Sequence, residues 1–130
     1  MNETKIKVLI IDDDKFLLNM YSIKFNKTGY EVNAAMGGEE ALEKIKGGYI
    51  PDIVLLDIVM PVMDGFDVLG AIKKDNLLPN AILIMLTNQG QLADIEKAKS
   101  LGATGYIIKA TTIPSEVVEE VTKIYNTNKK

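Results

Sequence analysis

Six polar side chains follow the apolar runs of this 130-residue chain, and their types suit phosphate chemistry. They are Asp12, Asp13, Asp14, Asp57, Thr87 and Lys109. Carboxylates that lie close together repel one another, and a bound divalent cation such as Mg²⁺ reverses that repulsion. An aspartate that accepts a phosphoryl group needs little beyond positioning and charge neutralisation, which a hydroxyl, an amine and a metal ion can supply.

The absence of two residue types excludes several kinds of catalytic and metal site. The chain has no His and no Cys, which excludes Ser-His-Asp catalysis, thiol catalysis, disulfides and imidazole or thiolate metal sites. All 15 basic residues are Lys, and 18 acidic residues give a net charge of −3. Because nucleic-acid recognition relies on Arg and on basic surfaces, we expect no nucleic-acid partner.

Hydrophobic patterning predicts five strands that alternate with five helices. The predicted strands are residues 6–11, 30–35, 52–57, 81–86 and 106–109. The predicted helices are residues 14–27, 38–46, 65–74, 91–101 and 114–125, and residues 126–130 are predicted to be a polar, frayed end. Strands that are apolar throughout indicate a parallel sheet covered on both faces, which is a doubly wound α/β fold. Since sites in such folds lie at the carboxyl ends of the strands, the polar side chains should converge there.

The length predicts one domain, residues 1–130, with a core at about residues 5–125. No apolar run is long enough to span a membrane, and the first residues do not form a secretory signal, so membrane insertion is not expected.

Four segments, taken in order, resemble the receiver domain of two-component response regulators, the CheY-like family. They are VLIIDDD at 8–14, PDIVLLDIVMPVMDG at 51–65, LT at 86–87 and GATGYIIK at 102–109. The resemblance covers about residues 5–125. It implies a flavodoxin-like three-layer sandwich in which the five strands take the order 2-1-3-4-5.

The resemblance assigns roles in phosphoryl and metal binding to four residues of these segments. It implies that Asp57 is the phosphoacceptor and a ligand of Mg²⁺, for which Mn²⁺ is an alternative. Asp13 is implied as a direct ligand, Asp12 as a ligand that acts directly or through water, and the backbone carbonyl of Val59 as a further ligand.

Switch residues and partners follow from the same resemblance. Thr87 and Lys109 are implied to grip the phosphoryl group, and Tyr106 to change rotamer on activation. The phosphoryl group would come from a sensor histidine kinase or a phosphotransfer protein. The downstream protein would bind a surface made of residues 91–101, 105–109 and 114–125. A cytoplasmic location and a homodimer that forms on phosphorylation are also expected.

The chain departs from the family pattern after Lys109. The family usually has a Pro at the next position, often after a cis bond, whereas this chain has Ala110 and a loop about one residue longer. Because a cis bond to a residue other than Pro costs about 2.5–4 kcal/mol, we predict a trans bond, with Lys109 still directed at Asp57. Asn88 stands where a small residue is common.

Three alternatives to a phosphorylated receiver remain from the sequence. One is a degenerate receiver that is never phosphorylated. The second is an aspartyl-phosphate hydrolase of the haloacid-dehalogenase type, for which Asp12 and Asp14 have suitable spacing but Phe16 does not match. The third is a flavodoxin-like mononucleotide binder, which would need a Ser/Thr/Gly-rich phosphate loop where this chain has three aspartates. We expect a signalling domain that at most catalyses its own phosphorylation and dephosphorylation, and not an enzyme.

Overall fold

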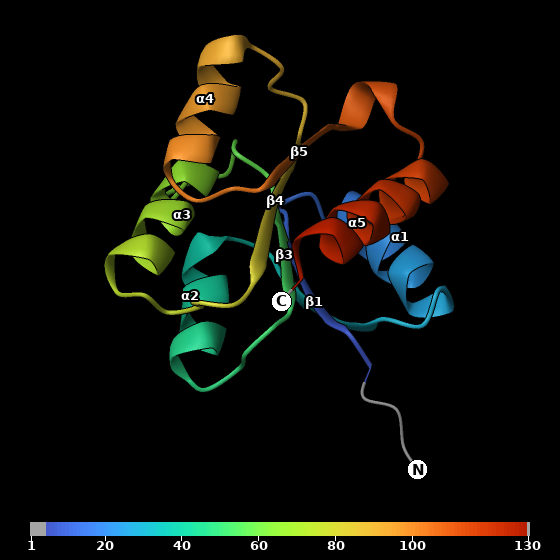
Figure 1. The fold of residues 1–130 in the computed structure, drawn as a ribbon, viewed down its shortest axis with the longest axis horizontal. Helices are drawn as coiled ribbons and strands as arrows, with labels where there is room; N and C mark the ends of the chain where they lie inside the picture. The colour runs from blue at the N-terminus through green and yellow to red at the C-terminus, as the bar shows by residue number, and fades with distance from the viewer. Residues whose placement is uncertain (1–4, 130) are drawn as a thin grey trace.

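A parallel sheet of five strands forms the centre of the protein (Figure 1). The computed structural model describes residues 5–129. The strands are β1 (Lys7–Ile11), β2 (Glu31–Ala35), β3 (Ile53–Leu56), β4 (Ile82–Thr87) and β5 (Gly105–Ile108). Their order in the sheet is β2-β1-β3-β4-β5 and every neighbouring pair is parallel, which confirms the predicted doubly wound arrangement.

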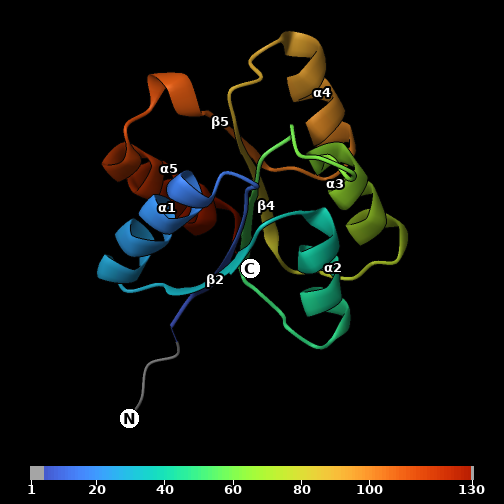
Figure 2. The ribbon, with the colours of Figure 1, turned by 180° about the vertical axis from the view of Figure 1, so that it is seen from behind.

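Five α-helices cover the two faces of the sheet. They are α1 (Lys15–Lys27), α2 (Gly38–Lys46), α3 (Gly65–Lys74), α4 (Leu92–Ser100) and α5 (Pro114–Asn128). Helices α1 and α5 lie on one face, and α2, α3 and α4 lie on the other, as Figures 1 and 2 show from opposite sides. No helix within residues 5–129 has both the length and the apolar composition that crossing a bilayer requires.

The buried strands divide the core into two layers, because successive side chains of a strand point to opposite faces. In β1, Val8 and Ile10 pack with the core of α1 and α5. Leu9 and Ile11 pack with the core of α2, α3 and α4. Both faces of the sheet are therefore buried, as the uninterrupted apolar runs predicted.

Local capping fixes where the helices begin and end. The Asp14 carboxylate accepts a hydrogen bond from the Leu17 N–H at 3.1 Å and caps α1. At α3, the Asp64 carboxylate accepts from the Asp67 N–H and the Asp67 carboxylate accepts from the Asp64 N–H, which is a complete capping box. The helix start that the hydrophobic patterning predicted at residue 65 is therefore confirmed.

The predicted frayed end is wrong for residues 126–128, because α5 continues to Asn128. The Thr127 hydroxyl donates to the Lys123 carbonyl at 2.9 Å, and the Asn128 amide donates to the Ile124 carbonyl at 2.8 Å. These side chains bond back onto the helix, so polar residues extend it where the loss of apolar periodicity predicted fraying. Residues 1–4 and 130, which the predicted domain includes, lie outside the described residues.

Candidate functional site

The register of two neighbouring strands brings Asp12 and Asp57 side by side. Ile11, the last residue of β1, is paired with Leu56, the last residue of β3. Each aspartate is the next residue along its strand, and the Asp57 N–H donates to the Ile11 carbonyl at 3.1 Å. Only 3% of Asp12 and 9% of Asp57 are exposed to solvent. Two carboxylates are thus held close together with little access to water, which requires a compensating cation.

Lys109 supplies that cation from the end of β5, the strand at one edge of the sheet. Its position follows from β5, where Ile108 pairs with Thr87 at the end of β4, so the next residue emerges at the same edge. The Lys109 Nζ lies 2.6 Å from Asp12 Oδ2 and 2.9 Å from Asp57 Oδ2. The prediction that Lys109 points at Asp57 is therefore confirmed.

The loop after Lys109 begins with a short 3₁₀ helix, η1 (Lys109–Thr111). Among the described residues every peptide bond is trans, which includes the bond between Lys109 and Ala110, as predicted. No pattern in the sequence predicted η1. With Ala110 after it, the Lys109 amine still points into the site.

Three carboxylates form a group that suits a hard divalent cation. One oxygen from each of Asp12, Asp13 and Asp57 lies within 4.8 Å of the others. One ammonium group, that of Lys109, offsets one of the three charges, and Mg²⁺ prefers oxygen ligands of this kind. The residues therefore fit a magnesium ion.

The hydrogen bonds of these carboxylates separate their roles. Asp12 uses Oδ1 to accept the Asp14 N–H at 2.9 Å and Oδ2 to accept from Lys109. Asp13 is exposed and, within residues 5–129, its carboxylate makes no hydrogen bond. Asp13 is thus the carboxylate of the group with both oxygens available to a metal ion, which agrees with the direct role that the resemblance implied.

Burial and the ion pairs act in opposite directions on the pKa of Lys109 and on the pKa of Asp12, and both values end above their usual ones. For Lys109, burial is the largest influence and lowers the pKa, but the hydrogen bonds to Asp12 and Asp57 together outweigh it and hold the pKa above its usual value. Burial raises the pKa of the Asp12 carboxyl above its usual value, although Lys109 and the Asp14 N–H lower it. The ammonium of Lys109 therefore stays charged at neutral pH and provides a fixed cation at the site.

Thr87 and Tyr106 both form hydrogen bonds with the backbone of the loop residue Gln89. The sequence did not predict a role for Gln89. Thr87 is fully buried, and its Oγ1 accepts the Gln89 N–H at 3.3 Å. The Tyr106 hydroxyl donates to the Gln89 carbonyl. Because Gln89 acts through its backbone, its residue type carries no signal of this role. The bonds connect the buried hydroxyl of the site to the half-buried ring of Tyr106 on β5.

A pocket of about 340 Å³ brings nearly all the predicted site residues together. It is lined by Asp12, Asp13, Asp14, Leu17, Asp57, Val59, Thr87, Asn88, Gln89 and Lys109. Val59 is 59% exposed at its rim. Tyr106 is the predicted residue that lies outside this lining.

Comparison with known proteins identifies the family. The family model for the response regulator receiver domain matches residues 8–122 of the chain. The chain belongs to the response regulator receiver family. This receiver domain is 42% identical over 119 residues to the chemotaxis protein CheY of Thermotoga maritima. The aligned residues make up 91% of this chain and 96% of that protein. It is also 42% identical over 107 residues to the probable transcriptional regulator ycf27 of Guillardia theta, which covers 82% of this chain. The chain spans only 41% of the length of that regulator.

Solved structures agree with the family. The CheY-like receiver domain protein of Methanospirillum hungatei matches with a TM-score of 0.87 at 29% identity, over 96% of this chain and 97% of that chain. Chemotaxis protein CheY4 of Vibrio cholerae matches with a TM-score of 0.85 at 30% identity, over 93% of this chain and 99% of that chain. The flavodoxin-like order of the sheet is therefore shared with CheY-like structures.

Membership in this family settles the general role. Receiver domains are signalling domains of two-component systems, not classical enzymes, and they interact with histidine kinases or phosphotransfer proteins and with downstream targets. They bind Mg²⁺ at an acidic pocket, and Asp12, Asp13 and Asp57 form such a group here. This role disfavours the hydrolase and the mononucleotide binder, so the degenerate receiver is the alternative that still has to be tested.

Proposed function

We propose that Asp57 of this receiver domain accepts a phosphoryl group from the phosphohistidine of a sensor histidine kinase or phosphotransfer protein, in a reaction that requires Mg²⁺. The observation that carries the proposal is the position of the Lys109 amine, which bonds to Asp57 and Asp12 at the carboxyl edge of the sheet. A degenerate receiver would have no need to keep this cation and three carboxylates in one pocket.

The chemistry of the transfer follows from the groups around Asp57. A carboxylate oxygen of Asp57 attacks the phosphorus while the phosphorus–nitrogen bond of the donor breaks, and the departing imidazole nitrogen takes the electron pair. The product is an acyl phosphate on Asp57. Lys109 pairs with the phosphoryl oxygens, and the Thr87 hydroxyl donates a hydrogen bond to them. Mg²⁺ bound by Asp13, Asp57 and the Val59 carbonyl, with Asp12 as a direct or water-mediated ligand, would neutralise the remaining charge.

Output should leave the domain by protein contact. The hydrogen bonds from Thr87 to Gln89 and from Gln89 to Tyr106 lead from the pocket towards β5. A phosphoryl group that draws the Thr87 hydroxyl towards itself would loosen the bond to Gln89 and release Tyr106. We therefore place the output surface on α4, β5 and α5, for a downstream protein or for a homodimer that forms on phosphorylation. In this role residues 1–130 act as one receiver domain in the cytoplasm.

Intact-mass spectrometry after incubation with acetyl phosphate and Mg²⁺ tests the proposal. One phosphoryl group should be added to the wild-type protein and none to Asp57→Asn. Asp52→Asn is the matched control, because Asp52 precedes the same strand at its opposite end and accepts a hydrogen bond from the Lys7 N–H. This control should be labelled like the wild type. Full labelling of Asp57→Asn would overturn the assignment, and an unlabelled wild-type protein would favour the degenerate receiver.

A further inference from the structure

The outer edge of β5 is open to another strand. β5 pairs with β4 on one side and, within residues 5–129, with no strand on the other. The Thr104 N–H donates to the Leu83 carbonyl at 2.7 Å, so the alternation of a parallel strand turns the N–H and C=O groups of Gly105 and Ile107 outward. Unpaired groups of this kind are a template for an added strand.

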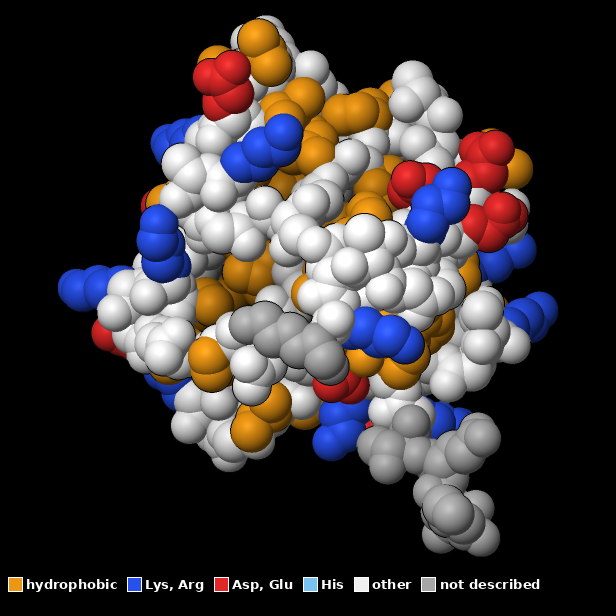
Figure 3. Space-filling view, viewed as in Figure 1, with side chains coloured by type: hydrophobic (Ala, Val, Ile, Leu, Met, Phe, Trp, Pro, Cys, Tyr) orange, Lys and Arg blue, Asp and Glu red, His pale blue; other side chains and the backbone are white. Residues whose placement is uncertain are grey.

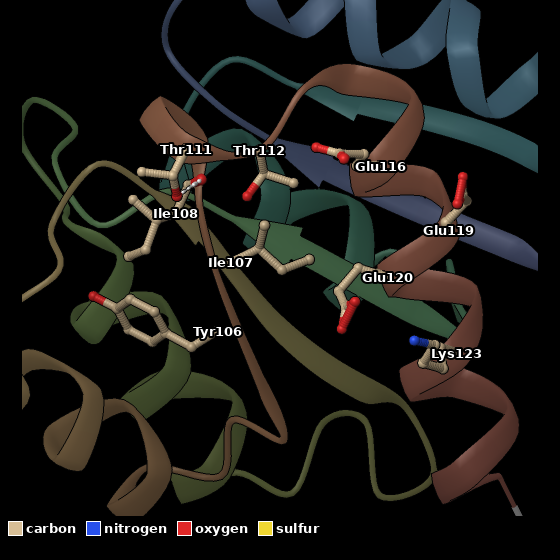
Figure 4. Close-up of a pocket in the computed structure, with 9 residues that line it drawn as sticks. All are labelled: Tyr106, Ile107, Ile108, Thr111, Thr112, Glu116, Glu119, Glu120 and Lys123. Atoms are coloured by element: carbon tan, nitrogen blue, oxygen red, sulfur yellow. Dashed lines mark hydrogen bonds between the residues drawn. The ribbon is translucent and has the colours of Figure 1, made fainter.

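A groove of about 500 Å³ runs between this edge and α5, and Figure 4 shows the residues that line it. The α5 wall is formed by Glu116, Glu119, Glu120 and Lys123. Their spacing of three, four and seven residues places all four on one stripe of the helix. Figure 3 shows acidic side chains gathered over this part of the surface, at the upper right. The wall therefore carries two more negative than positive charges.

The acidic side chains of this wall are available to a partner. Among the described residues the only ion pairs are those of Lys109, so none of the three glutamates is neutralised by a lysine of the chain. The Glu116 Oε1 accepts the Ile113 N–H at 3.1 Å, which fixes that side chain at the start of α5. Glu119 and Glu120 are exposed neighbours of equal charge. A cation of a partner near either carboxylate would gain a favourable charge interaction.

The opposite side of the edge is apolar. Tyr106 and Ile108 project from β5 away from α5, as Figure 4 shows, whereas Ile107 faces the α5 side. Leu92, the first residue of α4, is 69% exposed. A strand added to β5 would thus direct alternate side chains towards the acidic wall and towards this apolar side.

We infer that β5 and this groove bind an extended segment of a partner protein in which Lys or Arg residues alternate with aliphatic residues. Backbone hydrogen bonds to Gly105 and Ile107 would hold the segment as a sixth strand. Its cations would face Glu119 and Glu120. The inference deepens the proposed output surface, on which it rests, by naming the chemistry of the partner.

A second copy of the chain suits this site poorly. The cation nearest to β5 in the sequence is Lys109, which Asp12 and Asp57 already bind. Pairing one β5 edge with another would also bring two acidic walls together. Charge complementarity therefore favours a basic segment of a different protein.

Fluorescence anisotropy with a labelled, end-capped peptide Lys-Val-Lys-Ile-Lys-Val-Lys tests the inference. We expect saturable binding that weakens as salt is raised, and no binding of the peptide with Glu in place of Lys. The double variant Glu119→Gln/Glu120→Gln should bind the basic peptide about five- to tenfold more weakly, since each exposed charge pair contributes modestly. Glu39→Gln/Glu43→Gln removes the same charge from exposed positions on α2 and should bind like the wild type.

Hydrogen exchange locates the peptide. Binding should slow exchange of the Gly105 and Ile107 amides. Unchanged exchange there, equal binding of the acidic peptide, or equal affinities of the two double variants would each overturn the inference. Protection of these amides by self-association, seen by sedimentation without peptide, would assign the edge to a second copy and also overturn it.

The phosphorylation assay is kept separate, so that failure of the docking inference and failure of the proposed function can be distinguished. The affinity of the protein for the basic peptide should change severalfold when Asp57 is phosphorylated. If Asp57 is labelled and the peptide does not bind, the docking inference alone is wrong. If the peptide binds at β5 and Asp57 is never labelled, the proposed phosphoacceptor function alone is wrong.

Discussion

At the scale of single residues, Lys109 is what allows Asp12 and Asp57 to be buried side by side. Lys109→Ala would leave two carboxylates adjacent without their cation. We expect the free energy of unfolding to fall by about 2–3 kcal/mol in urea denaturation at pH 7. In an Asp12→Asn background the same change should cost less, because one of the two charges has already been removed. Equal costs in the two backgrounds would contradict the role assigned to the ion pairs.

Tyr49 gives a second prediction at this scale, because its buried hydroxyl has no hydrogen-bond partner among the described residues. Burial, with smaller contributions from Glu31 and Asp52, raises the pKa of Tyr49 to about 12. Tyr49→Phe should increase the free energy of unfolding by about 1 kcal/mol at pH 7, because it removes an unpaired polar group.

The pKa of Tyr49 also predicts alkaline behaviour. Above its usual pKa of 10.0 the unfolded chain releases the Tyr49 proton while the folded protein keeps it. The wild-type protein should therefore lose stability as the pH rises from 10 towards about 12, and this part of the loss should be absent in Tyr49→Phe. Urea denaturation across this range, followed with phenolate absorbance, measures the difference. Identical pH dependence of the two proteins would contradict the pKa assignment.

At the scale of elements, the start of α3 is packed directly against the backbone of Asp57, the proposed phosphoacceptor. A Cβ atom added at Gly65 would overlap the Asp57 carbonyl oxygen and lie 2.9 Å from the Ile58 Cα. Gly65→Ala should therefore shift Asp57, slow labelling by acetyl phosphate and lower the free energy of unfolding by about 1–3 kcal/mol.

Gly70 in the same helix is the matched control. A Cβ atom there would have no neighbour within 4 Å. Gly70→Ala should increase the free energy of unfolding by about 0.5–1 kcal/mol, because Ala favours a helix interior, and should leave labelling unchanged. Equal effects of the two substitutions would show that α3 does not position Asp57 through Gly65.

Most of these elements were predictable because each has a local signal. Helices α2 and α3 begin and end at the residues that the hydrophobic patterning predicted. The strands differ from prediction by one residue at some ends, since an apolar run does not mark its last ladder hydrogen bond. The last turn of α5 and η1 escaped prediction, because the first depends on side-chain bonds of polar residues and the second on how the loop closes over Lys109.

The site was predictable to a similar extent, for a different reason. Asp12, Asp57, Thr87 and Lys109 sit at strand ends, so parallel pairing alone brings them to one edge. The family resemblance added the roles expected of Val59 and Tyr106. Gln89 could not be found, because its backbone makes the bonds.

At the scale of the whole molecule, a net charge of −3 is distributed so that acid gathers at the carboxyl edge of the sheet and along α5. The first cluster is compact and partly buried, and the second lies in an open groove beside β5. A divalent ion suits the first, and a flexible basic chain suits the second. The same acidic excess can thus serve two kinds of ligand, because burial and shape differ.

Mg²⁺ binding should consequently stabilise the whole fold. A ligand that binds only the folded state raises the free energy of unfolding by an amount set by its concentration relative to Kd, about 2.7 kcal/mol at a hundred times Kd. We expect the Tm to rise with Mg²⁺ and to return to its starting value on chelation. Asp13→Ala should remove most of the rise, because both oxygens of Asp13 are available to the ion. Asp12→Ala should remove less, because Asp12 already bonds to Lys109 and to the Asp14 N–H.

A control for the Mg²⁺ response of the Asp13→Ala and Asp12→Ala variants is a variant of a carboxylate that lies far from the pocket. Asp75→Asn removes an exposed charge at the opposite end of α3 and should keep the full response to Mg²⁺. Removing any carboxylate changes repulsion within the protein, so the quantity to compare is the Tm difference with and without Mg²⁺ for each variant. A Tm that does not respond to Mg²⁺ in the wild-type protein would rule out the proposed metal site. An equal or larger loss of response in Asp12→Ala would assign the direct contact to Asp12, with Asp13 acting only through its charge.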